Sequence, residues 1–276
     1  MAITAQDVNK LRQMTGAGMM DCKKALVEAD GDFDKAVEIL RKKGQKISAS
    51  RSDRETNEGS VFVKSSDDLK EAVLISLNCE TDFVGKNEEF QQAGNSILEV
   101  AFKEKPASIE ELKKLKLGDL TIEEKLTELV GKIGEKIDIG AYERLSGDMV
   151  VSYIHSGSRL GVLVALANVG GDAEEAGRDI GMQIAAMNPV ALDKDQVDQS
   201  TIDRELEIGR EQARAEGKPD NIIDKIAEGK LNKFYKDNTL VNQAYVKEPS
   251  MSVAQYLDSV NKGMKVIAFK RVSVSE

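Results

Sequence analysis

Apolar residues between positions 5 and 43 recur every three or four residues, the spacing of one face of an α-helix. Breaks at Thr15-Gly16 and at residues 30–32 divide this part into three short predicted helices, and Asp32 suits the N-cap of the third. We expect the third helix to end at Gly44. Residues 1–44 are therefore predicted to form a small helical domain.

The pattern changes after a polar stretch, residues 45–58, which we interpret as a linker or an exposed basic helix. Residues 61–63 alternate, residues 66–68 suit a turn, and the apolar run 72–77 is typical of a buried strand. Helical spacing follows in residues 90–101 and 122–137, the second opened by a capping box at Thr121 and Glu124. With a further strand near 139–145, residues 59–145 form a predicted first half of a core.

The order strand, turn, buried strand and helix then occurs again in residues 149–187, at a period of about ninety residues. We therefore predict an α+β fold with antiparallel sheets and a duplicated core, whose second half spans residues 146–276. Residues 198–236 read as a charged helical hairpin inserted into that half, because two amphipathic segments flank a Gly-Lys-Pro-Asp turn. The hairpin either packs on the core or protrudes and supports a homodimer.

Charge and residue usage favour a binding protein over an enzyme. The formal net charge of −9 disfavours a general nucleic-acid binder. The chain has one histidine, His155, and neither a phosphate-loop motif nor a nucleophile elbow, so we expect no catalytic residues, no metal site and no cofactor. Cys22 and Cys79 lack metal or redox spacing, and no membrane span or signal region is evident, which predicts a cytoplasmic protein.

Two short stretches are candidate interaction sites. In residues 78–87 (NCETDFVGKN), Phe83 follows the end of a predicted strand and is either a core residue or an exposed tip beside Asp82. The corresponding point of the second half, residues 170–172, has no aromatic, which favours a functional role for Phe83. In residues 15–26 (TGAGMMDCKKAL), Met19 and Met20 are either core residues or an adaptable apolar patch. Its glycines imitate a dinucleotide fingerprint, but a helix and not a strand precedes them.

Both stretches, together with residues 131–135 (GKIGE) and 152–155 (SYIH), resemble the elongation factor Ts family along the whole chain. The N-terminal helices also resemble a ubiquitin-associated domain. The family resemblance implies a guanine-nucleotide exchange factor that binds elongation factor Tu, in its GDP-bound and nucleotide-free forms, and promotes GDP release. It implies that Asp82 and Phe83 insert near the magnesium and phosphate site. The residues expected to bind the partner are Thr81, Asp82, Phe83, Val84, Met19, Met20, Lys23, Ile133 and His155.

A function of another class stays open. The protein could be a non-catalytic adaptor whose N-terminal helices recruit some other protein. In that case residues 1–44 alone would hold the main affinity and Phe83 would be dispensable.

Overall fold

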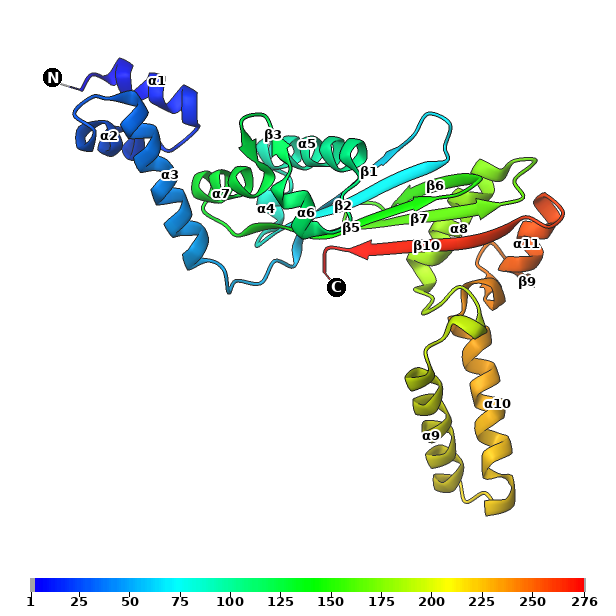
Figure 1. Cartoon of the computed structure of the whole chain (residues 1–276). Helices are drawn as coiled ribbons and strands as arrows, with labels where there is room; N and C mark the ends of the chain where they lie inside the picture. Colours follow the sequence, from blue (N-terminus) through cyan, green and yellow to red (C-terminus); the bar gives the residue numbers. More distant parts are fainter. Residues whose placement is uncertain (1–2, 276) are drawn as a thin grey trace.

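Two antiparallel three-stranded sheets pack face to face at the centre of the chain, and helices cover both outer faces (Figure 1). This computed structural model describes residues 3–275. Alternating apolar side chains produce the arrangement, because successive residues of a strand point to opposite faces of its sheet. Val61, Leu74, Val150 and Leu163 fill the layer between the sheets, while their neighbours in sequence face the helices. The predicted α+β class with antiparallel sheets is confirmed.

The N-terminal domain contains α1 (Ala5–Thr15), α2 (Met19–Glu28) and the start of α3 (Phe33–Ser50). Leu11, Cys22 and Leu26 are fully buried between these helices. Thr4 caps α1 in a capping box and Asp32 caps α3, as expected for the latter. The predicted end of α3 at Gly44 is wrong, because the helix continues to Ser50. Of the two alternatives for residues 45–58, residues 45–50 are therefore helical.

The first half of the core contains the sheet β1-β2-β5, made of β1 (Glu58–Ser65), β2 (Glu71–Cys79) and β5 (Ile137–Ser146). The central strand β2 is buried along most of its length, as its apolar run predicts. The outer face carries α5 (Glu88–Glu104) and α7 (Ile122–Ile133), and the predicted capping box at Thr121 opens α7. Three short elements were not predicted: α6 (Ile109–Lys114), β3 (Lys116–Leu117) and β4 (Leu120–Thr121).

The second half repeats this plan with the sheet β10-β7-β6. Its strands are β6 (Met149–Ile154), β7 (Leu160–Ala167) and β10 (Lys265–Ser273). The outer face carries α8 (Ala173–Met187) and α11 (Val253–Val260), which bury Ile180, Ile184 and Leu257. In each half the second strand is central, and a long helix lies beyond it in sequence.

A helical hairpin leaves the second half between α8 and β10 and extends away from the sheets (Figure 1). It consists of α9 (Gln199–Ala215) and α10 (Asp220–Asn238), which cross closely where Gly209 meets Ala227. Short elements surround its base: η1 (Lys194–Gln196), η2 (Leu240–Asn242), β8 (Ala244–Tyr245) and β9 (Glu248–Ser252). The hairpin therefore protrudes.

Candidate protein-interaction site

The residues after β2 form a single helical turn, α4 (Asp82–Gly85). Phe83 is 82% exposed, the most exposed large apolar residue among those the structure describes. Its neighbour Val84 is buried in the core cluster of the first half. The turn therefore has an anchored side and a presented side, and of the two alternatives for Phe83 the exposed tip is the one found.

Several hydrogen bonds fix this turn to its surroundings. Glu135, just beyond α7, accepts hydrogen bonds from the Thr81 backbone N–H (3.1 Å) and from the Thr81 hydroxyl (2.8 Å). The Cys79 thiol donates to the Thr81 carbonyl at 3.1 Å, and the Gln91 amide donates to the Gly85 carbonyl at 2.6 Å. Because both ends of the turn are held, Phe83 is presented in a defined position.

Asp82 is half exposed and pairs with Lys86 one turn later, at 2.7 Å. The hydrogen bond from Lys86 holds the pKa of the Asp82 carboxyl below its usual range. The carboxylate is therefore charged at neutral pH, next to Phe83. Since both side chains of the pair are largely exposed, the pair is easily exchanged for another partner.

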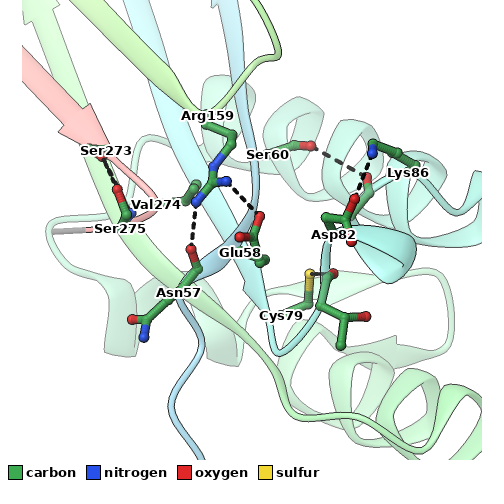
Figure 2. A network of polar contacts seen from close by, with 12 residues as sticks. Asn57, Glu58, Ser60, Cys79, Asp82, Lys86, Arg159, Ser273, Val274 and Ser275 are labelled. Carbon is green, nitrogen blue, oxygen red and sulfur yellow. Dashed lines mark hydrogen bonds and ion pairs between the residues drawn. The ribbon is translucent and has the colours of Figure 1, made fainter.

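His155 lies at the same end of the sheets as this turn, in the connection between β6 and β7. That connection is tied to the start of β1: Val61 donates its N–H to the Ser158 carbonyl at 2.7 Å, and Arg159 contacts Asn57 and Glu58, each at 2.9 Å (Figure 2). His155 itself is exposed, and its Nδ1 lies 3.0 Å from the Tyr153 hydroxyl.

Met19 and Met20 open α2 and are 57% and 63% exposed, and Lys23 is exposed one turn later. The N-cap of α2 is Gly18, which offers no side chain there, so the two methionines stand uncovered at the helix start. Met19, Met20 and Lys23 are called the α2 patch below. The α2 patch lies in the N-terminal domain, whereas Phe83 lies in the first half of the core.

Ile133, the last residue of α7, is only partly buried and packs against the core cluster of the first half. Its neighbours in sequence, Lys132 and Glu135, reach toward the two exposed features. Lys132 lies beside Gly16, close to the start of α2, while Glu135 holds Thr81. The structure thus connects the α2 patch and the α4 turn through the C-terminal end of one helix.

No group of three or more His, Cys, Asp or Glu side chains within residues 3–275 is arranged to hold a metal ion. None of the helices in that range is both long and apolar enough to cross a membrane. The exposed Phe83 and the α2 patch are apolar side chains beside charged ones, and such surfaces suit contact with another protein.

Comparison with known proteins decides the family. A sequence-family model described as Elongation factor TS matches residues 80–276. The chain belongs to the elongation factor Ts family. It is 56% identical over 275 residues to Elongation factor Ts of Amoebophilus asiaticus and 57% identical over 275 residues to that of Cytophaga hutchinsonii, in each case over 99% of both chains. It is 43% identical over 280 residues to Elongation factor Ts of Chlorobaculum tepidum, over 98% of this chain and 97% of the relative.

In this member of the elongation factor Ts family, the residues that support the tip were not found by sequence reasoning. The sequence pattern points to Glu135 only as part of the segment 131–135, and it gives no reason to single out Gln91. Their contacts join positions 54 and 6 residues apart, so no local spacing could reveal the first. A carboxylate directly after a helix-ending Gly134 was the one available signal.

Proposed function

We propose that this protein is a guanine-nucleotide exchange factor that binds elongation factor Tu and promotes the release of GDP during translation elongation. The observation that carries the proposal is the exposed Phe83 on a turn that hydrogen bonds hold at both ends. An exposed aromatic side chain lowers solubility unless a partner buries it. An aromatic side chain whose backbone is already fixed loses little conformational entropy on binding.

Phe83 and Asp82 would insert into elongation factor Tu near its magnesium and phosphate site. Burying a phenylalanine contributes about 2–3 kcal/mol, and a carboxylate brought beside bound Mg²⁺ and phosphate changes the electrostatic balance there. Thr81 would act through its hydrogen bonds to Glu135. Val84 would anchor the turn from the core side, because its side chain is buried.

The α2 patch, Ile133 and His155 would supply further contacts to the same partner. Exchange then follows from linkage: if the factor binds nucleotide-free elongation factor Tu more tightly than the GDP form, each ligand weakens the other by the same factor. No covalent bond is made or broken, so the protein needs neither catalytic residues nor a cofactor of its own. We expect it to work in the cytoplasm, and self-association through the α9–α10 hairpin stays a prediction.

The test is release of a fluorescent GDP analogue from elongation factor Tu in the presence of catalytic amounts of the protein. We expect strong acceleration, and for Phe83→Ala a fall in kcat/KM on the order of thirtyfold or more, the kinetic equivalent of about 2 kcal/mol. Val190→Ala is the matched control, because Val190 is also exposed (58%) but follows α8 in the other half of the core.

Equal exchange by Phe83→Ala and the parent would refute the insertion. If the parent does not accelerate release at all, the adaptor function takes precedence. A fragment of residues 3–50 would then be expected to capture the same partners as the full chain.

A further inference from the structure

Helices α3 and α7 cross at two glycines. A Cβ built on Gly131 of α7 would lie 2.6 Å from the Gly44 Cα, a separation that real side chains essentially never show. A Cβ built on Gly44 would instead lie 3.5 Å from the Thr127 carbonyl oxygen and 3.6 Å from the Gly131 Cα, which is ordinary contact. The two backbones therefore touch, and only Gly131 is sterically required at the crossing.

The rest of the joint between the N-terminal domain and the core is thin. Arg41 pairs with Glu128 at 3.4 Å, Lys132 lies beside Gly16, and Ile47 packs against the core cluster of the first half. Beside the crossing, a hollow of about 530 Å³ separates α1–α3 from α7. Because exposed ion pairs contribute little, the direct backbone contact and Ile47 carry most of the fit.

The chain that leaves α3 is also held. Arg51 pairs with Glu80 at 2.9 Å, directly before Thr81. The Lys136 ammonium donates to the Ser52 and Arg54 carbonyls at 2.7 and 2.9 Å. Residues 51–54 are thus tied to the same stretch that supports the α4 turn, and do not behave as a free tether.

We propose that the Gly44–Gly131 crossing sets the orientation of the N-terminal domain, so that the α2 patch and Phe83 form one prearranged two-part docking surface. Gly131 is then a positioning residue for the exchange reaction. The kinetic part of this proposal rests on the proposed function, whereas the structural part does not. Two contacts held in a fixed relation bind more tightly than two contacts joined by a flexible segment, because less orientational freedom is lost on binding.

The asymmetry of the crossing gives a matched set of variants. Gly→Ala inside a helix favours the helix itself, so Gly44→Ala, Gly131→Ala and Gly229→Ala all gain propensity. Gly229, in α10, has open space around it. Of these, only Gly131→Ala should force the helices apart. Gly44→Leu is a second disruptive variant. It changes α3 of the N-terminal domain and not a helix of the core, so it carries the test if Gly131→Ala does not fold.

The first readout is structural and uses the full chain alone. Spin labels at Lys24→Cys in α2 and Asn95→Cys in α5 report the interdomain distance by double electron–electron resonance, and the native Cys22 and Cys79 are buried. We expect a narrow distance distribution for the parent, Gly44→Ala and Gly229→Ala, and a broad one for Gly131→Ala and Gly44→Leu. A broad distribution in the parent, or a narrow one in both disruptive variants, would overturn the proposal whether or not the protein exchanges nucleotide.

The second readout is the dependence of GDP release on the concentration of elongation factor Tu·GDP. A loosened domain weakens docking but leaves Phe83 and its supports intact, so KM should rise about tenfold with kcat unchanged. Broad distances with an unchanged KM, or a fall in kcat alone, would contradict the positioning role.

Discussion

One buried carboxylate joins the parts of the second half around the base of the hairpin. Asp179, in α8, accepts hydrogen bonds from the Tyr245 hydroxyl (2.6 Å), the Lys247 ammonium (2.6 Å) and the Tyr256 hydroxyl (3.0 Å). The two tyrosine rings stack with centroids 4.0 Å apart. These partners belong to β8, the β8–β9 turn and α11, so a single side chain connects three segments to α8.

We predict that Asp179→Ala lowers the free energy of unfolding by about 3 kcal/mol. Tyr245 is only 4% exposed, so its hydroxyl would lose its partner where water cannot replace it. The Lys247 side chain is 48% exposed and would be rehydrated, so it adds little to the loss. Glu174→Ala, in the first turn of α8, is the control; its pair with Arg178 is exposed, so it should change stability by no more than about 0.5 kcal/mol.

The measurement is urea unfolding followed by far-ultraviolet circular dichroism, repeated as a function of pH with Asp179→Asn. Burial opposes ionisation of Asp179, but the hydrogen bonds from Lys247, Tyr245 and Tyr256 outweigh it and lower its pKa. A lowered folded-state pKa gives a contribution that is complete above the unfolded pKa, near 3.8, and disappears as the pH falls through the folded value. The gap between the parent and Asp179→Asn should thus be constant from pH 7 to about 5 and shrink below about pH 4. A gap that does not change with pH, or a loss under about 1 kcal/mol for Asp179→Ala, would refute the reasoning.

Two further predictions concern the α4 turn. Glu135→Ala removes both hydrogen bonds to Thr81, so kcat/KM for GDP release should fall on the order of tenfold while the unfolding midpoint stays close to the parent's; equal activity would show that the turn needs no support from α7. Burial, with the nearby charges of Glu135 and Glu58, raises the pKa of the Cys79 thiol to about 12. In a Cys22→Ala background, iodoacetamide at pH 8 should therefore react far more slowly with the native protein than with the urea-unfolded chain, and equal rates would contradict the burial.

Elements in which the apolar spacing repeats over many residues could be predicted from the sequence. Strands β1, β2, β5, β6 and β7, the start of the helix opened by Thr121 and the duplicated plan follow from apolar spacing and appear as expected. The predicted continuation of that helix to residue 137 is wrong, because α7 ends at Ile133 and Ile137 begins β5. Elements of one turn or two residues, such as α4 and β8, are shorter than any period and escape this reasoning. Residues 200–203 (STID) also read as a capping signature, but the N-cap of α9 is Asp198, whose carboxylate accepts hydrogen bonds from both Ser200 and Thr201.

Gly44 shows why a local rule fails when the cause is distant. A glycine after a helical run is usually a stop signal. Here the missing side chain of Gly131, eighty-seven positions away in the sequence (131 − 44 = 87), lets the backbones of α3 and α7 touch at Gly44, and α3 continues for six residues to Ser50. The exposure of Phe83 was accessible from its polar neighbours, but the hydrogen bonds that hold its turn come from residues that only folding brings near.

The C-terminal end of α7 has a place in both proposals. Within one turn and the residues after it, Gly131 touches α3, Lys132 lies against Gly16 and pairs with Glu89, and Glu135 holds Thr81. A displacement of this segment would change the orientation of the N-terminal domain and the support of Phe83 together. The variants separate these effects, because Gly131→Ala acts on the side that faces α3 and Glu135→Ala on the side that faces Thr81. If the free-energy loss of exchange activity in the double variant equals the sum of the two single losses, the two sides act independently. A loss larger or smaller than the sum would show that α7 transmits one effect to the other.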